Sequence, residues 1–344
     1  MKLIDTKDAV GHVLCHDITQ IIPGRSKGPV FKKGHIVTKE DIPVLLSVGK
    51  EHLYVWEKTE GMLHEDEAAY MLKEMCMGES ETMSAGEPSE GKIEIRAAVD
   101  GLLKIDRDKL VKVNSLGEMM IATVHGDYPV KAGDKLAGTR IIPLVIEEEK
   151  MMRAKKLCGE EPILKILPFK HVRYGLVTTG NEVFSGRIQD AFGPSIKAKL
   201  GAYDTEFMGQ VILPDDREGI TKAIESFVAE GADMVLVSGG MSVDPDDKTP
   251  GAIKDTGADI ISYGAPVLPG AMFLLSYLKR GEGEVPVLGL PGCIMYAKRT
   301  VFDLVLPRVL SGERLTREDL AAYGEGGLCL NCETCHFPNC GFGK

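Results

Sequence analysis

One stretch of the chain combines residue types that could bind an anion, Ser238-Gly-Gly-Met-Ser-Val-Asp-Pro-Asp-Asp-Lys-Thr249. It follows the apolar run 234–237, which is short enough to be a buried parallel strand. Gly239 and Gly240 would let a ligand approach backbone N–H groups at the carboxyl end of that strand, where open α/β sheets bind their ligands. The pattern therefore predicts an anion-binding turn.

Three carboxylates follow in the same loop, at Asp244, Asp246 and Asp247. Carboxylates placed beside a bound anion need a cation between them, and Mg²⁺ prefers oxygen ligands. The loop therefore predicts a Mg²⁺-bridged anion site. A solvated acidic turn is the alternative interpretation.

A second group of reactive residues lies near the C-terminus, where four thiols fall within a dozen residues: Cys329, Cys332, Cys335 and Cys340. Their gaps of two, two and four residues are similar to the spacing of [4Fe–4S] ligands. Zn²⁺ is the alternative, with His336 able to replace one thiol, although zinc sites usually separate their cysteine pairs by a longer loop. A disordered or redox-active thiol tail is the third possibility. A bound metal would supply folding energy that such a segment cannot obtain from a core of its own.

The elements around the first stretch must hold it in place. From residue 172 onward, short apolar runs alternate with helical patterns, which predicts βαβ units and a mostly parallel sheet covered on both faces. We expect strands at 172–178, 207–213, 234–237, 260–263, 272–278 and 285–288, and helices at 192–200, 218–230, 250–256 and 294–306. Thr249 should cap the third helix, and Pro307 should stop the last.

Three turns fall at strand ends in this pattern, at 178–182, 238–249 and 290–292. Side by side, they would build one crevice lined with glycine amides and helix N-termini. Four charged side chains could reach it: Glu182, Asp215, Asp247 and Lys248. The crevice would suit a phosphate group with a metal ion.

The chain before residue 169 predicts smaller units. The stretch 61–77 has the pattern of an amphipathic helix, and 79–91 is rich in Ser, Glu, Gly and Pro, as flexible linkers are. Alternation over 92–146 predicts a compact β domain, with one strand starting at Lys112, and a helical connector follows at 147–157. The predicted divisions are a mixed unit at 1–60, helix and linker at 61–91, a β-rich domain and connector at 92–168, an α/β domain at 169–312 and a cysteine-rich tail at 313–344.

The composition limits the possible partners. The 344 residues carry a net charge of −10, which argues against nucleic acid or an anionic membrane as the main partner. Hydrophobic residues make up 44% and charged residues 27%, an ordinary globular balance. The sequence contains no run of membrane-spanning length, starts without the apolar core of a signal peptide, and scatters its other cysteines, so we expect a cytoplasmic protein.

Four motifs, in this order, resemble the molybdopterin-binding domain of molybdopterin adenylyltransferase, molybdopterin molybdenumtransferase and gephyrin, which also occurs in competence-damage-inducible proteins. They are Thr179-Gly-Asn-Glu-Val183, Pro214-Asp-Asp216, the stretch 238–249 and Leu290-Pro-Gly292. The resemblance covers about residues 170–310. The segments 11–18, 33–42 and 131–139 are similar to the molybdenumtransferase type.

The resemblance implies a three-layer α/β/α domain that binds the pterin dithiolene and its phosphate or AMP ester. In the molybdenumtransferases, adenylated molybdopterin is hydrolysed as molybdate is inserted, and Mg²⁺ is required. By position, Asp215 and Asp247 would handle Mg²⁺ and the phosphoanhydride, a task that needs charge neutralisation more than a strong nucleophile. The implied cofactor-binding positions are Thr179, Gly180, Asn181, Glu182, Ser238, Gly239, Gly240, Ser242, Lys248, Thr249, Pro291 and Gly292.

The sequence also departs from the family's pattern. Leu268-Pro-Gly-Ala271 stands where the molybdenumtransferases have Lys-Pro-Gly-Lys, so two lysines that would suit molybdate or the pterin phosphate are absent. Cys293 and Ile294 replace Asn-Pro after the last motif, and Asn181 replaces an aspartate. The cysteine tail stands in place of the family's C-terminal β domain.

These features support one leading hypothesis and two alternatives. The first is an enzyme of molybdenum cofactor biosynthesis that binds molybdopterin or its adenylate and takes part in Mg²⁺-dependent molybdenum insertion with AMP release. A non-catalytic protein that delivers the cofactor to a molybdoenzyme would explain the absent lysines. An adenylyltransferase or pyrophosphatase would use the same aspartates on another substrate. By analogy with relatives, we expect a homo-oligomer.

Overall fold

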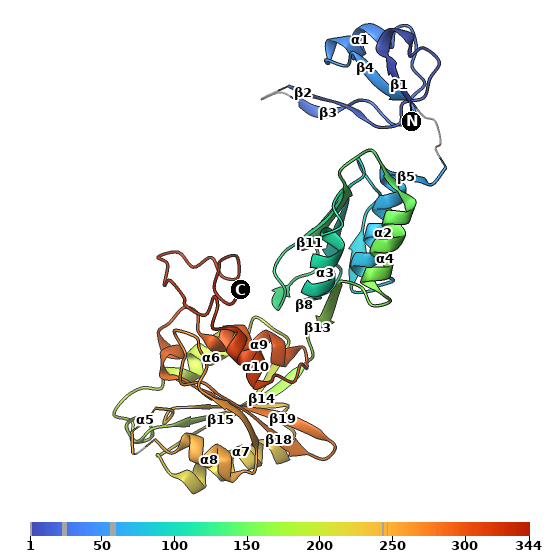
Figure 1. The fold of residues 1–344 in the computed structure, drawn as a ribbon. Coiled ribbons are helices and arrows are strands. Elements are labelled where there is room, and N and C mark those ends of the chain that lie inside the picture. The colour runs from blue at the N-terminus through green and yellow to red at the C-terminus, as the bar shows by residue number, and fades with distance from the viewer. Residues whose placement is uncertain (1, 23–25, 56–59, 243, 246) are drawn as a thin grey trace. The chain divides into compact units, whose positions relative to one another are not determined.

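The computed structural model describes residues 2–22, 26–55, 60–242, 244–245 and 247–344. The chain divides into two compact units, which are traced in Figure 1. Unit 1 consists of Met1–Ala98, Ile105–Val124 and Ala132–Lys165, and unit 2 of Val99–Lys104, His125–Lys131 and Ile166–Lys344. Among the described residues, no helix has both the length and the apolar character that crossing a bilayer requires.

Unit 2 contains a six-stranded sheet in the order β15-β14-β16-β19-β18-β17. The strands are β14 (Val172–Thr179), β15 (Thr205–Leu213), β16 (Met234–Ser238), β17 (Asp259–Tyr263), β18 (Leu274–Arg280) and β19 (Gly283–Leu290). The first four strands in the sheet order run parallel, whereas β18 is antiparallel to both β19 and β17. The predicted mostly parallel sheet is therefore confirmed.

Helices cover both faces of this sheet (Figure 1). They are α5 (Asn181–Phe184), α6 (Phe192–Leu200), α7 (Arg217–Ala229), α8 (Thr249–Asp255), the 3-10 turn η2 (Gly292–Met295), α9 (Val301–Leu310) and α10 (Arg317–Ala322). Leu236 packs in the core that α6, α9 and α10 share, and its neighbours Val235 and Val237 pack in the core that α7 and α8 share. This explains why β16 is apolar at every position, and it confirms the predicted three-layer α/β/α architecture.

The last helix of the domain differs from the prediction. Residues 294–306 were expected to be helical and Pro307 to stop the helix, but α9 begins at Val301 and contains Pro307. The start is fixed by a capping box, in which the Thr300 N–H donates to Asp303 at 2.8 Å. All ten residues of α9 are buried, so packing outweighs the one backbone hydrogen bond that Pro307 cannot make.

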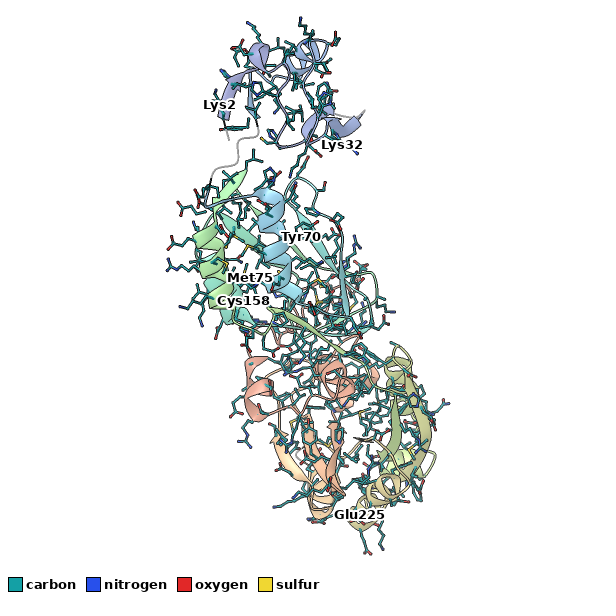
Figure 2. All side chains as sticks on the ribbon, turned by 90° about the vertical axis from the view of Figure 1, so that its right-hand side faces the viewer. Lys2, Lys32, Tyr70, Met75, Cys158 and Glu225 are labelled. Atoms are coloured by element: carbon teal, nitrogen blue, oxygen red, sulfur yellow. The ribbon has the colours of Figure 1, made fainter. Side chains whose placement is uncertain are left out.

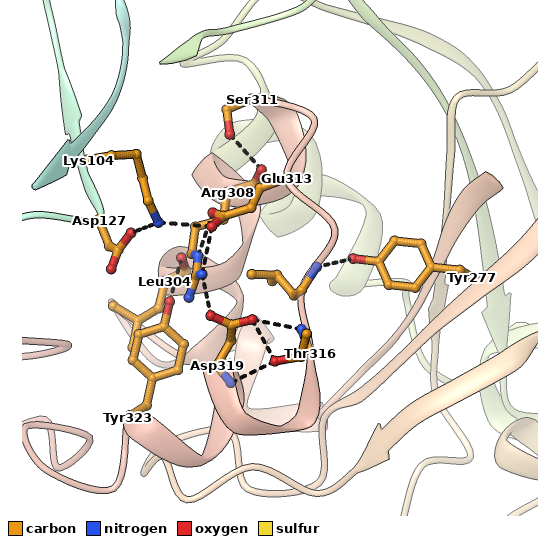
Figure 3. Close-up of polar contacts among 11 residues, drawn as sticks. Lys104, Asp127, Tyr277, Leu304, Arg308, Ser311, Glu313, Thr316, Asp319 and Tyr323 are labelled. Carbon is orange, nitrogen blue, oxygen red and sulfur yellow. Dashed lines mark hydrogen bonds and ion pairs between the residues drawn. The ribbon is translucent and has the colours of Figure 1, made fainter. Parts of the chain in front are cut away.

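A buried arginine fixes the segment that follows α9 (Figure 3). The Arg308 side chain is 4% exposed, and its guanidinium donates to Glu313 and to Asp319, at 2.7 Å in each case. The Lys104 ammonium donates to the same Glu313 carboxylate at 2.9 Å. Asp319 also forms a capping box with Thr316 that starts α10. This network positions the start of the cysteine tail.

Unit 1 begins with a small mixed subdomain. It contains β1 (Lys2–Asp5), η1 (Thr6–Asp8), β2 (Ile18–Ile22), β3 (Ser26–Phe31), α1 (Asp41–Ser47) and β4 (His52–Val55). Strand β1 pairs with β4 and β2 with β3, all antiparallel. A small core that includes Leu14, Leu45 and Leu53 holds these elements together.

The rest of unit 1 is a four-stranded antiparallel sheet with helices. Its elements are β5 (Met62–His64), α2 (Glu65–Met77), β6 (Met83–Ala85), β7 (Ile93–Ala97), α3 (Arg107–Asn114), β9 (Met119–Thr123), β11 (Lys135–Ile141), β12 (Val145–Glu147) and α4 (Glu148–Cys158). The sheet order is β6-β7-β11-β9. Helices α2 and α4 pack together where the Cys158 thiol donates to the Met75 carbonyl, a pair that lies side by side in Figure 2.

Two predictions for this region are wrong. The stretch 79–91 was expected to be a flexible linker, but β6 lies within it, and Met83 pairs there with Ala97. The strand expected from Lys112 is the end of α3, because Asp106 accepts a hydrogen bond from the Lys109 N–H at 2.9 Å and starts a helix upstream.

A separate three-stranded sheet has the order β10-β8-β13. It comprises β8 (Gly101–Ile105), β10 (Tyr128–Val130) and β13 (Leu164–Pro168).

Candidate functional site

The three predicted turns leave the sheet side by side. Thr178 of β14 is in register with Ser238 of β16, and Ser238 is in register with Leu290 of β19. Because these strands are parallel, their carboxyl ends form one edge, where open α/β sheets bind ligands. The structure therefore brings the turns at 178–182, 238–249 and 290–292 to one edge of the sheet.

The first two turns approach each other so closely that a side chain would not fit between them. Gly239 has φ +90°, and a Cβ added there would lie 2.1 Å from the Thr179 carbonyl oxygen. Gly240 has φ +54°, and its Cβ would lie 3.0 Å from the Thr249 hydroxyl. The glycine pair is thus required both for its backbone conformation and for the contact with β14.

Two hydroxyl groups hold the loop that follows the glycines. The buried Thr249 hydroxyl donates to the Gly239 carbonyl at 2.8 Å. The Tyr263 hydroxyl donates to the carbonyls of Met241 and Ser242, at 2.8 and 3.2 Å. Thr249 is the first residue of α8 rather than its cap, which corrects the prediction: its hydroxyl bonds back to the glycine turn, and Lys248 occupies the cap position.

The turns at 238–249 and 290–292 line a pocket of about 500 Å³, within the usual size range of small-molecule sites, and the turn at 178–182 does not line it. We call it the glycine-turn pocket. It is lined by Phe192, Gly239, Gly240, Met241, Ser242, Asp244, Asp247, Gly270, Ala271, Met272, Pro291, Gly292, Cys293, Met295 and Tyr296. Of the predicted site residues, the lining therefore includes Gly239, Gly240, Ser242, Asp247, Pro291 and Gly292.

The charged side chains in this lining are acidic. Asp244 and Asp247 line the pocket, and none of the described lining residues is lysine or arginine. Lys248, which was expected to supply positive charge, donates instead to the Pro245 carbonyl of its own loop at 2.5 Å. Partial burial and the charge of Asp247 together raise the pKa of Tyr263. An anion here would need backbone N–H groups and a bound cation. Asp246 lies outside the described residues.

Two of the remaining predicted residues, Asn181 and Asp215, contact each other outside the pocket lining. The Asn181 N–H donates to the Asp215 carboxylate at 3.1 Å, and the Asp215 N–H donates to the Asn181 side-chain oxygen at 3.4 Å. Gly180, Asn181, Glu182 and Asp215 are not among the residues that line the glycine-turn pocket. In this arrangement Asp215 holds the first motif against the second.

Buried polar contacts behind the turns were not predicted from the sequence. The Gln210 amide donates to Asp190 at 2.7 Å and to the Thr178 hydroxyl at 2.9 Å, and the Thr178 and Ser238 hydroxyls lie 3.2 Å apart. Asp190 also accepts from the first N–H groups of α6. The available sequence signal was an aspartate just before a predicted helix, because short polar side chains near a helix start often accept hydrogen bonds from its first N–H groups.

Cys293 was also left out of the predicted site, although it lines the pocket. It directly follows the Leu290-Pro-Gly292 turn, and this position could have indicated its place. Burial raises the pKa of the Cys293 thiol, so the group favours its neutral form.

All four tail cysteines line a second cavity, of about 320 Å³, which we call the cysteine cavity. Cys332 and Cys335 are exposed, and Cys329 and Cys340 are partly buried. Hydrogen bonding from the Phe337 N–H and the nearby Arg299 lower the pKa of Cys335. Among the described residues, no three His, Cys, Asp or Glu side chains form a group that could hold a metal ion, and the metal in the tail stays a prediction.

A known protein family matches the part of the chain that contains these turns. The family described as "Probable molybdopterin binding domain" matches residues 175–311. Residues 175–311 belong to this domain family. The predicted resemblance is confirmed for this part of the chain. Upstream, residues 3–57 match a family described as a domain of unknown function.

Two curated relatives illustrate the range of proteins that share this domain. A molybdopterin molybdenumtransferase from Synechococcus elongatus is 26% identical over 163 residues, which cover 45% of this chain and 38% of that protein. A CinA-like protein from a Mycobacterium species is 38% identical over 77 residues, which cover 22% of this chain and 18% of that protein. The chain thus spans less than two fifths of the length of these relatives.

Part of the chain is also similar to solved structures. The tungsten cofactor synthesizing protein MoaB from Pyrococcus furiosus is 22% identical, with 41% of this chain and 92% of that chain covered and a TM-score of 0.35. The molybdopterin biosynthesis enzyme MoaB from Thermus thermophilus is 23% identical, with 41% and 98% covered and a TM-score of 0.34.

Proposed function

We propose that the chain binds molybdopterin or its adenylate in the glycine-turn pocket and takes part in Mg²⁺-dependent molybdenum insertion with release of AMP. The observation that carries this proposal is that two turns of the molybdopterin-binding domain family, at 238–249 and 290–292, line one pocket that contains Asp247. The close contact of Gly239 with Thr179 supports a turn whose backbone is open to a ligand.

The lining suits both parts of such a ligand. Phe192, Met272 and Tyr296 offer aromatic and apolar surface to a flat heterocycle. The glycine turn offers backbone N–H groups to a phosphate, and a helix dipole adds little here because α8 is only seven residues long. The pocket lining thus contains groups that suit each of the two chemical halves of a phosphorylated pterin.

The carboxylates fit a hard divalent cation. Asp247 and Asp244 carry the oxygen ligands that Mg²⁺ prefers, and Mg²⁺ usually keeps several water ligands, so few protein ligands are needed. Bound there, Mg²⁺ would neutralise phosphate charge. In this proposal, Asp247 is a ligand of the cation, and Asp215 positions Asn181 and the first turn.

The test uses adenylated molybdopterin with molybdate, with and without Mg²⁺. We expect the wild-type chain to release AMP only with Mg²⁺, and Asp247→Asn to lower the rate by at least about tenfold, because the amide cannot replace the charge. Glu218→Gln on α7, whose carboxylate is exposed and paired with Lys222, is the matched control and should keep the rate. Equal release by wild type and Asp247→Asn would refute the assigned role of Asp247.

One observation favours a second candidate function, delivery of the mature cofactor to a molybdoenzyme. Gly270 and Ala271 line the pocket, and its described lining contains no basic side chain that would hold molybdate. A carrier needs affinity without turnover, so wild-type chain that binds molybdopterin but releases no AMP would establish this alternative. AMP release that Asp247→Asn abolishes would exclude it. A panel of other nucleotide substrates would test the pyrophosphatase alternative.

A further inference from the structure

The tail that carries the four cysteines is docked on unit 2 by backbone hydrogen bonds. The Leu268 N–H donates to the Gly327 carbonyl, and the Cys329 N–H donates back to the Leu268 carbonyl, both at 2.8 Å. The Gly343 N–H donates to the Gly326 carbonyl at 2.9 Å and closes the loop. These contacts define the path of the loop that bears the thiols.

Side chains hold the same loop against the segment before α9. The Lys298 ammonium donates to the carbonyls of Cys332 and Glu333 at 3.0 and 2.6 Å. The Arg299 guanidinium lies 4.8 Å from the centre of the Phe337 ring, and Phe342 is buried in the core of the domain. Two cations therefore stand beside the cysteines, where they would offset the charge of thiolates.

We propose that this loop binds a [4Fe–4S] cluster through Cys329, Cys332, Cys335 and Cys340. The four thiols line one cavity of about 320 Å³. Zinc sites usually separate their two cysteine pairs by a longer loop than the two residues between Cys332 and Cys335. A [4Fe–4S] cluster is held by four thiolates, and the spacing of the first three cysteines is that of known cluster loops.

The chemistry of the surroundings agrees with a cluster. Leu328, Leu330, Phe337 and Phe342 give the cavity an apolar lining, while Lys298 and Arg299 carry positive charge at the same cavity. Low polarity and nearby cations are features that proteins use to set the potential of such clusters. The proposal does not depend on the function proposed for the glycine-turn pocket.

Residues close together in the sequence line the cysteine cavity and the glycine-turn pocket. Cys293, Met295 and Tyr296 line the glycine-turn pocket, and Lys298 and Arg299 line the cysteine cavity. One short segment, 293–299, thus contributes to both cavities.

The first test is anaerobic purification of the full chain with analysis of iron, acid-labile sulfide and zinc. We expect about four irons and four sulfides per chain and a broad visible absorption band that bleaches on reduction. Chain purified without metal would be incubated with ferrous iron and sulfide under reducing conditions. One zinc per chain, or failure to take up iron and sulfide in this incubation, would overturn the proposal.

Variants locate the cluster. Cys332→Ser and Cys335→Ser change exposed side chains, so the fold should persist while iron and the visible band are largely lost. Cys293→Ser is the matched control. Cys293 belongs to the same unit but does not line the cysteine cavity, so this variant should keep the iron. Unchanged iron in the tail variants, or loss in the control alone, would contradict the assigned ligands. Thermal unfolding of each variant checks that the chain is folded.

Discussion

The Thr249 hydroxyl donates a hydrogen bond of 2.8 Å to the carbonyl oxygen of Gly239, so the first residue of α8 is tied to the turn at the end of β16. The two residues are ten positions apart in the sequence, and the Thr249 hydroxyl also lies 3.4 Å from the Thr179 hydroxyl. A single buried threonine thus fixes the two ends of the acidic loop and holds them against β14. This bond between α8 and the glycine turn leads to the first prediction.

Thr249→Val keeps the shape of the side chain but removes the donor, which leaves the Gly239 carbonyl without this partner. We expect a loss of about 1–3 kcal/mol in the free energy of unfolding and weaker binding of molybdopterin. Thr256→Val at the other end of α8 removes a comparable hydroxyl bond, to the Ile253 carbonyl, and should leave binding intact. Urea unfolding and ligand titration of both variants measure the two effects. Equal binding losses in the two variants would show that Thr249 has no special role.

Gly239→Ala places a methyl group 2.1 Å from the Thr179 carbonyl oxygen, so the turn must move away from β14. Binding of molybdopterin should fall by at least about tenfold, because the backbone N–H groups would lose their alignment. Gly257→Ala is the matched control: its φ is +77°, but nothing lies within 4 Å of the added carbon. That variant should lose about 1 kcal/mol of stability and keep its affinity.

Arg308→Met removes the buried cation between Glu313 and Asp319. Glu313 and Asp319 are partly exposed and keep Lys104 and Thr316 as partners, so we expect the lost hydrogen bonds to lower the free energy of unfolding of unit 2 by about 1–3 kcal/mol. Arg314→Met, which removes an exposed arginine paired with Asp259 and Glu284, should cost about 1 kcal/mol or less. Calorimetry of the two variants compares them directly. A cost for Arg308→Met as small as that of the control would mean that the network does not stabilise the fold.

The same network predicts the acid sensitivity of the fold. Burial alone would raise the pKa of Glu313 and of Asp319, but hydrogen bonds from Arg308 outweigh it and lower both pKa values. Since the carboxylates have lower pKa values in the folded state, their contribution to stability is present above about pH 4 and is lost as the pH falls through the lowered values. Wild-type stability should therefore drop steeply below about pH 4. Arg308→Met should show a shallower drop, and an identical pH profile would contradict this assignment.

The sheet and its turns could be predicted from the sequence because their signals are local. Val235, Leu236 and Val237 are continuously apolar, and glycines follow at Gly239 and Gly240, so the strand and its turn are evident from neighbouring residues. Because parallel strands end at the same edge of a sheet, Ser238 at the end of β16 is then expected beside Thr178 at the end of β14, as the structure shows. The shared edge of the three turns was predictable for this reason, but the absence of the turn at 178–182 from the pocket lining was not.

Other features depend on contacts between distant residues and were missed. Pro307 lies inside α9 because every neighbour in that helix is buried, which no local pattern reveals. Lys248 turns to its own loop and Asp215 bonds to Asn181, so neither side chain lines the pocket where sequence position had suggested them. The positions of these side chains depend on their hydrogen-bond partners, and these partners can be identified only in the folded structure.

The most direct measurement is equilibrium binding of molybdopterin to the intact wild-type chain, with Gly239→Ala and Gly257→Ala measured in parallel. Saturable binding by wild type and by Gly257→Ala, with a loss of at least about tenfold in Gly239→Ala, is the result expected if the ligand lies in the glycine-turn pocket. Absence of binding by the folded wild-type chain, or equal affinity of all three chains, would contradict the proposed site.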